Sequence, residues 1–202
     1  MKLRSKHLTY IGIAIVVFVI LYALKNTAYF VRASAFVSSL AVFWIVDTLL
    51  DLKFRVRHYV LLVFIATTGI LLSPFYYLYP GYDKVLHFFN PILFSILIFY
   101  LVNKIKGISF SKKLFLTFSI TVSFLALFEL IEFFLDKMYD LNLQGVYIWE
   151  VSETAAAKVR LIMDRNDDTM IDLALGVLGT VLFSIGKTIE IYYKKLNKKK
   201  TK

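Results

Sequence analysis

Acidic side chains recur at helical spacing in three places along this chain, and a histidine joins them. The pairs are Asp83 with His87, Glu129 with Glu132, and Asp168 with Asp172. The members of each pair are three or four residues apart, so each pair can lie on one face of a helix. Clustered carboxylates with an imidazole suit divalent cations such as Mg, Mn or Zn, and such groups also transfer protons. We treat all six as candidate metal ligands, and His87 and Glu132 also as candidate catalytic residues.

The elements that carry these pairs are predicted to be membrane helices. Of the 202 residues, 59% are hydrophobic and the mean hydropathy is +0.70, whereas a soluble domain is roughly 45–50% apolar. The chain has no cysteine, which excludes disulfides and thiolate metal sites. The predicted fold class is therefore all-α, a polytopic helical bundle in a membrane, in which any metal must rely mainly on oxygen ligands.

Hydropathy predicts about six transmembrane helices, since each span needs roughly 17–25 mostly apolar residues. Their ranges are 8–24, 33–50, 58–78, 85–102, 113–135 and 169–187. No repeat or linker divides the chain, so we expect one integral-membrane domain over residues 1–202. Before the last span, residues 140–165 are predicted to form an extracytoplasmic helical loop, with a short helix over 152–163, SETAAAKVRLIM. A basic tail, 188–202, follows the last span.

The two signs of charge are distributed unevenly over the predicted loops. Seventeen of the 24 Lys and Arg residues fall on one side of the predicted spans, and positive loops stay in the cytoplasm. Both termini are therefore expected to be cytoplasmic in a multi-pass protein of the cell membrane. Of the 14 acids, 11 lie in or beside the other half, which places the candidate site near the extracytoplasmic face.

The formal charge of +10 is thus mainly a signal of topology, and the basic tail can contact anionic membrane lipids. A nucleic-acid partner is excluded, because the chain lacks a soluble module in which basic and stacking residues alternate.

The negative charge of several acids in a membrane must be neutralised. A carboxylate toward the bilayer centre costs at least about 2.5–3.5 kcal/mol. Protons, Arg160 or Arg165, or a divalent cation can offset that cost. In a purely structural interpretation, acids at a helix N-terminus complement its dipole for about 0.3–1 kcal/mol. Asp164 and Asp167 fit that interpretation, whereas Asp172 lies deeper and indicates a functional polar site.

Three other features are interpreted as structural. Asp47 and Asp51, four residues apart at the end of the second span, are expected to pair with the basic residues that follow them. Gly176 and Gly179 continue the face of the last predicted span that carries acids, and should let a neighbouring backbone approach closely. Residues 74–82, PFYYLYPGY, are typical of an interfacial aromatic belt that ends in a Pro-Gly turn.

Together the acidic motifs resemble those of a known family. The motifs are Asp83-Lys84-Val85-Leu86-His87-Phe88, Glu129-Leu130-Ile131-Glu132 and Asp168-Thr169-Met170-Ile171-Asp172. Over about residues 60–186 the chain resembles the YjdF-type family of inner-membrane proteins and, more distantly, VanZ-like proteins, which are linked to glycopeptide resistance. This resemblance implies the same six site residues. Asp167 and Met170 stand where the YjdF-type pattern usually has Trp and Gln, which implies a different substrate preference.

Three functions are consistent with these features. In the first, an integral-membrane enzyme uses a divalent cation to polarise a phosphoryl or ester oxygen of a lipid or polyprenyl head group, while His87 or Glu132 moves the proton. The second is a cation- or proton-coupled transporter, and the third is a structural protein whose polar cluster fixes helix register. The absence of internal repeats argues against common transporter designs, so we favour the enzyme or a head-group handler. The sequence does not define the substrate, the metal or the oligomeric state.

Overall fold

The chain divides into two compact units, Met1–Phe75 and Tyr76–Lys202. In the computed structural model, the described residues are 12, 16, 27–139, 142–150 and 158–200. The predicted span 8–24 therefore lies almost entirely outside the described residues. Each unit is considered by itself below, and a single domain over the whole chain stays a prediction.

Four helices in the described part of the chain are long and apolar enough to cross a membrane. They are Phe30–Leu49, Tyr82–Val102, Phe110–Tyr139 and Arg165–Asn197. These helices overlap the predicted spans 33–50, 85–102, 113–135 and 169–187, and the last two extend beyond them at both ends. The apolar segment Val56–Leu71 is shorter, so a count of six spans stays a prediction.

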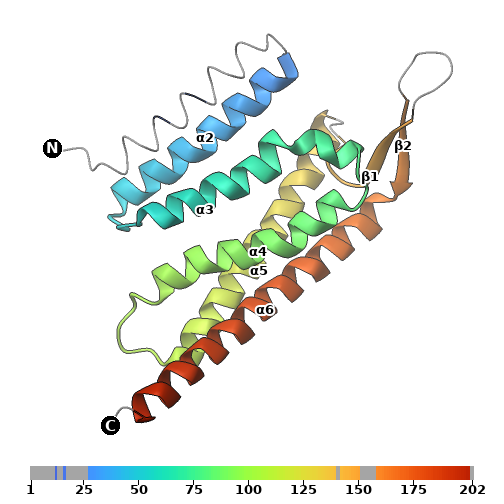
Figure 1. The fold of residues 1–202 in the computed structure, drawn as a ribbon. Coiled ribbons are helices and arrows are strands. Elements are labelled where there is room, and N and C mark those ends of the chain that lie inside the picture. The colour runs from blue at the N-terminus through green and yellow to red at the C-terminus, as the bar shows by residue number, and fades with distance from the viewer. Residues whose placement is uncertain (1–11, 13–15, 17–26, 140–141, 151–157, 201–202) are drawn as a thin grey trace. The chain divides into compact units, whose positions relative to one another are not determined.

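The first unit contains α2 (Thr27–Leu49) and α3 (Val56–Ala66), followed by a π-turn, η1 (Thr67–Leu71), and the 3₁₀ helix η2 (Ser73–Tyr77), which begins in this unit (Figure 1). The turn between α2 and α3 is fixed by buried Asp47. Its carboxylate accepts hydrogen bonds from the Phe54 amide at 3.1 Å and from the Tyr59 hydroxyl. The other predicted acid, Asp51, pairs with Lys53 at 3.0 Å on the surface, as expected.

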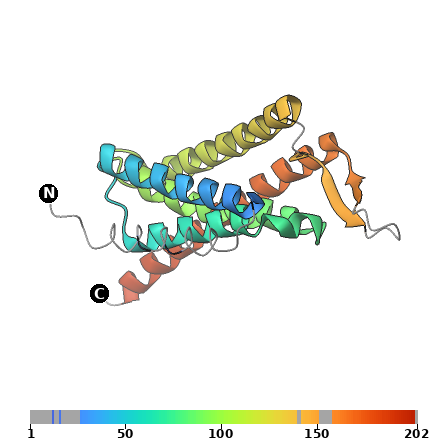
Figure 2. The ribbon, with the colours of Figure 1, turned by 90° about the horizontal axis from the view of Figure 1, so that it is seen from above.

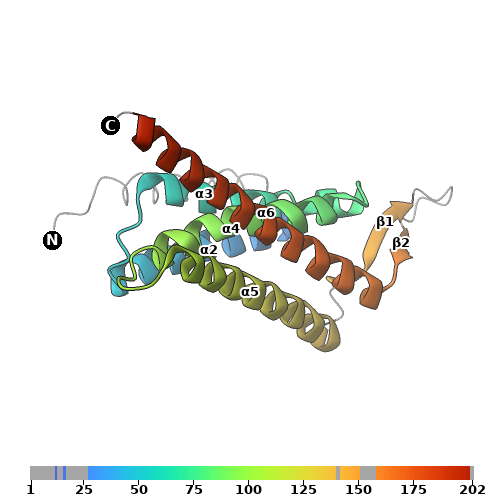
Figure 3. The same cartoon turned by 90° about the horizontal axis from the view of Figure 1, so that it is seen from below.

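The described part of the second unit contains three long helices and a hairpin. The helices are α4 (Tyr82–Val102), α5 (Phe110–Tyr139) and α6 (Arg165–Lys200), and α6 runs along α4 (Figure 3). Asp164 caps α6, because its Oδ1 accepts hydrogen bonds from the amides of Asn166 at 2.9 Å and Asp167 at 3.1 Å. This capping confirms the structural role predicted for Asp164.

Glycines bring the three helices close together. A Cβ atom on Gly179 would collide with the carbonyl oxygen of Phe88 in α4, and one on Gly176 would collide with the Leu125 side chain in α5. The close backbone approach predicted for these glycines is confirmed at Gly179 and is typical of helix packing in membranes, whereas Gly176 makes room for a side chain. As a result, the polar faces of α4, α5 and α6 are close enough for their side chains to interact directly.

A β-hairpin replaces the helix that the sequence predicts between the last two spans. Strand β1 (Val146–Glu150) pairs antiparallel with β2 (Lys158–Met163), between the end of α5 and the start of α6 (Figure 2). The expected helix over 152–163 is therefore wrong for its described part, residues 158–163. The segment VYIWE is rich in β-branched and aromatic residues and offers VRLIM a strand partner, so residues 158–163 pair as a strand where a helix was expected. We call this the hairpin end of the unit.

Candidate functional site

All six residues predicted to form a site lie at the hairpin end of the second unit, where α4 and α6 begin and α5 ends. They are joined there by a lysine that the sequence analysis did not select. We define the carboxylate cluster as Asp83, Lys84 and His87 from α4, Glu129 and Glu132 from α5, and Asp168 and Asp172 from α6. Pro91, one turn beyond His87 in α4, has no amide hydrogen to bond the His87 carbonyl, which interrupts the helical hydrogen bonding at the cluster.

Lys84 is the positive charge at the centre of the cluster. Its Nζ lies 3.2 Å from Asp83 Oδ2 and 2.7 Å from Asp172 Oδ2, and it also bonds Asp168 Oδ1. An ammonium has three N–H donors, so the side chain meets one carboxylate with each. The sequence alone suggested Arg160 or Arg165 for this role, although the position of Lys84 beside Asp83 was an available signal.

His87 has a carboxylate beside each of its ring nitrogens. Nε2 lies 3.3 Å from Asp83 Oδ1, while Nδ1 lies 3.6 Å from Glu129 Oε1 and 3.9 Å from Asp172 Oδ1. A neutral imidazole carries only one N–H, so its other nitrogen would turn a lone pair toward a carboxylate. A proton or a metal cation is therefore needed on one side of the ring.

Asp172 carries an unsatisfied oxygen at this position. Its side chain is only 2% exposed, and Asp172 Oδ1 has no hydrogen-bond partner within the described residues. One ligand atom from each of Asp83, His87 and Asp172 lies within 4.8 Å of the other two. One imidazole nitrogen and two carboxylate oxygens are a donor set that suits Zn²⁺ or Mn²⁺, so these residues fit a divalent cation.

The cluster has more acids than bases. Five carboxyl groups, on Asp83, Glu129, Glu132, Asp168 and Asp172, face one lysine and one histidine. Even with His87 protonated, full ionisation would leave three uncompensated negative charges, and like charges in contact disfavour the ionised state. The cluster therefore has the capacity to take up protons or a divalent cation.

Two buried acids at this end fix the loop that leads to the hairpin. Asp136 accepts hydrogen bonds from the amides of Leu143 at 2.7 Å and Gln144 at 2.9 Å. Asp168 Oδ2 accepts one from the Gly145 amide at 2.7 Å, and its Oδ1 is bonded to the lysine. Both oxygens of each carboxylate are thus engaged, and Asp168, predicted as a metal ligand, lies next to the three-residue group without belonging to it.

The two glutamates of α5 lie beside His87. Glu129 is buried, with 5% of its surface exposed, and it lines the same pocket as Thr169. The Thr169 hydroxyl accepts a hydrogen bond from Gln144 at 2.9 Å. Glu132 is half-buried and within electrostatic range of Glu129 and His87, so the structure brings both glutamates to the cluster without placing them in the three-residue group.

Tyr76, just before α4, is a further member of the site that the sequence analysis assigned to an interfacial belt. Its phenol is within electrostatic range of Asp83 and Glu132. Its ring meets that of Tyr82 edge to face, with centroids 5.3 Å apart. The crowded segment PFYYLYPGY gave no signal that distinguished this tyrosine from its neighbours.

The part of the chain that carries the cluster is shared with a family of membrane proteins. Residues 6–190 match the family described as predicted membrane protein (DUF2238), and this range includes the whole carboxylate cluster. No curated protein and no solved structure matches the chain. Because the match covers most of the sequence, the chain belongs to the predicted membrane protein family DUF2238.

Proposed function

We propose that this protein is a divalent-cation-dependent membrane enzyme, or a handler of lipid head groups, with Asp83, His87 and Asp172 as the metal ligands. One observation carries the proposal: Asp172 Oδ1 is buried, lacks a hydrogen-bond partner among the described residues, and faces His87 and Asp83. A buried ionisable group left unsatisfied in a membrane helix is costly and is usually retained for function. The nature of the ligands favours Zn, Mn or Mg.

Lys84 positions the ligands in this proposal. Asp83 and Asp172 each place Oδ2 on its ammonium and direct Oδ1 toward His87. The lysine therefore fixes the orientation of both carboxylates and reduces their mutual repulsion. A cation bound by Asp83, His87 and Asp172 would polarise a phosphoryl or ester oxygen. With His87 as a ligand, proton transfer falls to Glu132, which lies near the ring and outside the three-residue group.

The same proposal assigns a location and a substrate class. The charge distribution supports a multi-pass protein of the cell membrane with about six spans and both termini in the cytoplasm. The cluster then opens toward the extracytoplasmic side, where its substrate would be a lipid or polyprenyl head group. The resemblance of the acidic motifs to YjdF-type and VanZ-like proteins supports an action at the cell envelope.

The alternative proposals are a cation- or proton-coupled transporter and a purely structural cluster. A transport path needs polar groups that can exchange partners along the bundle. Two buried hydroxyls of the described bundle, those of Thr117 and Thr180, each donate at 2.8 Å to a carbonyl of their own helix. This is the ordinary way in which membrane helices satisfy hydroxyls, so transport has the weaker support.

Direct cation binding tests the proposal. Detergent-purified protein would be titrated calorimetrically with Mn²⁺, Zn²⁺ and Mg²⁺, beside Asp172→Asn and Asp83→Asn. We expect at least one of these cations to bind the wild type, and each substitution to weaken that binding by about 100-fold or more, because each removes a charged ligand.

The matched control for this titration is Asp167→Asn, which changes an exposed acid in the first turn of the same helix and should bind as the wild type does. Equal affinity in all four proteins would refute the metal site. Cation flux into proteoliposomes that is lost in Asp172→Asn would favour the transporter instead.

A further inference from the structure

Among the described residues, helices α5 and α6 flank two open cavities, one toward each end of their contact. The helices touch where Leu125 packs on Gly176, and side chains on either side of this contact line the two spaces. The cavity at the hairpin end has a volume of about 650 Å³, and the other has about 410 Å³. The first, which we call the hairpin cavity, is lined in part by Glu129 and Thr169. It therefore adjoins the carboxylate cluster.

The walls of the hairpin cavity change in character along the helices. Toward the middle of the two helices it is lined by Ala126, Leu130 and Leu173, and at the end nearest the hairpin, which we call its rim, by Lys137 from the end of α5 and Arg165 from the start of α6. A phospholipid changes from apolar to charged in the same way along its length, from its acyl chains to its head group. The rim is cationic, so it complements a negatively charged head group.

We propose that the hairpin cavity binds one anionic phospholipid, with its phosphate between Lys137 and Arg165 and its acyl chains along the apolar wall. Asn166, also on the rim, provides an amide donor for the phosphate oxygens. As an account of the substrate, this inference rests on the proposed function, because it places the lipid beside the cluster that would act on it.

The depth of the polar residues matches the layout of a phospholipid. Thr169 follows Arg165 by four residues, so it lies about 6 Å further along α6, and it lines the cavity together with Glu129. A phosphate at the rim would therefore place the glycerol and its ester groups at the level of Glu129. On its other side, Glu129 Oε1 lies 3.6 Å from His87 Nδ1. Glu129 is thus the link between the bound lipid and the metal ligands.

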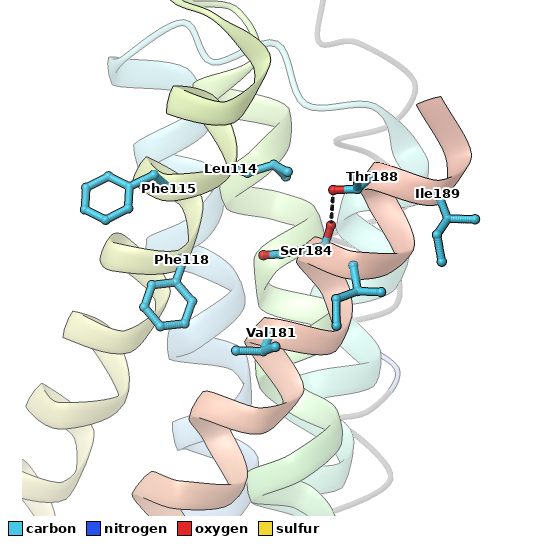
Figure 4. Close-up of a pocket in the computed structure, with 8 residues that line it drawn as sticks. Leu114, Phe115, Phe118, Val181, Ser184, Thr188 and Ile189 are labelled. Atoms are coloured by element: carbon cyan, nitrogen blue, oxygen red, sulfur yellow. Dashed lines mark hydrogen bonds between the residues drawn. The ribbon is translucent and has the colours of Figure 1, made fainter. Parts of the chain in front are cut away.

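The second cavity provides an internal comparison. Figure 4 shows its lining, which is apolar apart from Ser184 and Thr188 and contains no charged residue among the described ones. The Thr188 hydroxyl donates to the Ser184 carbonyl at 2.8 Å, and the Ser184 hydroxyl to the Thr180 carbonyl at 3.0 Å. No polar group of this lining is therefore available to select a head group, and only the hairpin cavity should distinguish anionic from zwitterionic lipid.

Native mass spectrometry of the purified full chain tests the inference. The protein would be titrated with phosphatidylglycerol and, separately, with phosphatidylcholine of the same chain length. We expect one phosphatidylglycerol to bind at least about tenfold more tightly than phosphatidylcholine. Lys137→Ala should weaken phosphatidylglycerol binding about fivefold, as expected for one lost basic residue near a head group, and Leu130→Trp should abolish it by filling the cavity.

Two matched variants complete this experiment. Lys112→Ala removes an exposed lysine at the opposite end of α5, and Leu114→Trp fills the second cavity instead. Both should retain the wild-type preference for phosphatidylglycerol. Equal binding of the two lipids by the wild type would overturn the inference, as would unchanged binding in both Lys137→Ala and Leu130→Trp.

The lipid inference and the metal proposal can fail separately. Measuring Mn²⁺ and Zn²⁺ binding on the same samples separates the two. Selective lipid binding without cation binding would keep the hairpin cavity and reject the proposed function. Cation binding without lipid selectivity would keep the proposed function and reject the lipid site in the hairpin cavity. Cation affinity that persists in Leu130→Trp would also show that the cluster has folded in that variant, so that a loss of lipid binding reports the cavity itself.

Discussion

Both units bury acidic side chains. Among the described residues, the buried acid of the first unit has both carboxylate oxygens hydrogen-bonded, whereas the second unit contains a buried acid with one oxygen left without a hydrogen bond. In the first unit Asp47, 4% exposed, receives the Phe54 amide on Oδ1 and the Tyr59 hydroxyl on Oδ2. In the second unit Asp172 is equally buried, yet its Oδ1 lacks a hydrogen-bond partner within the described part of the chain. A buried carboxylate with its hydrogen bonds complete stabilises the fold, whereas one left incomplete costs stability. The number of hydrogen bonds to the carboxylate thus distinguishes Asp47, which stabilises a turn, from Asp172, which has an oxygen available for a ligand.

The carboxylate cluster itself contains both kinds of acid. Asp168 has both oxygens engaged, by Lys84 and by the Gly145 amide, and resembles Asp47 in this respect. Asp83 and Asp172 share one oxygen each with Lys84 and turn the other toward His87. Mutations that separate these classes should therefore shift stability and cation binding in different directions.

Removing the shared counter-ion should have the largest effect on stability. Lys84→Met would leave three partly or fully buried carboxylates without their common ammonium, and breaking a buried ion pair typically costs about 3–5 kcal/mol. We expect the free energy of unfolding in detergent to fall by that order, and Mn²⁺ or Zn²⁺ to restore part of it. An unchanged unfolding midpoint would show that Lys84 does not stabilise the three carboxylates.

Asp47→Ala should destabilise the first unit by a smaller amount. The Phe54 amide and the Tyr59 hydroxyl would lose their acceptor, and leaving buried donors unsatisfied costs about 1–3 kcal/mol. Denaturant titration would show the loss, and cation affinity should stay the same. A loss of cation binding in this variant would mean that the two regions are not independent, and the comparison would fail.

Asp172→Asn should behave in the opposite way to Asp47→Ala. The amide removes one surplus negative charge from the cluster and still offers an oxygen to Lys84, so in EDTA we expect the stability to rise, by about 1 kcal/mol. Thermal unfolding in the absence of divalent cations checks the sign. A fall of several kcal/mol would show that Asp172 is a structural acid like Asp47.

Asp51→Asn provides the smallest expected effect. The pair Asp51–Lys53 is well exposed, with side-chain accessibilities of 70% and 61%, and surface ion pairs contribute about 0–1 kcal/mol. We expect an unfolding midpoint close to that of the wild type and unchanged cation binding. A large shift would mean that exposure is a poor guide to the role of an acid in this protein.

Sequence patterns were sufficient to predict the long helices and the general position of the site. Apolar runs such as 85–102 and 113–135 are long enough to leave little alternative to a membrane helix. The helical spacing of Asp83 with His87 likewise predicted a shared face, and the structure brings the two within 3.3 Å. Helix periodicity therefore carries most of this information.

The sequence could not predict which acids would find partners. Lys84 and Asp168 are 84 residues apart in the chain, so no local pattern links them, and nothing in the sequence marked Lys84 as the counter-ion of Asp168. The sequence also failed to predict the hairpin. Whether residues 158–163 form a strand depends on their pairing with β1, and local propensity does not reveal such pairing. Contacts between segments, rather than local propensity, thus determined both the counter-ion and the hairpin.

The central claim is that the cluster gives up stability so that it can bind a divalent cation. The most direct test is the thermal unfolding of wild type and Asp172→Asn, each in EDTA and in saturating Mn²⁺ or Zn²⁺. We predict that Asp172→Asn is at least as stable as wild type in EDTA, and that only the wild type gains stability when the cation is added. Equal stabilisation of both proteins by the cation, or of neither, would contradict the account.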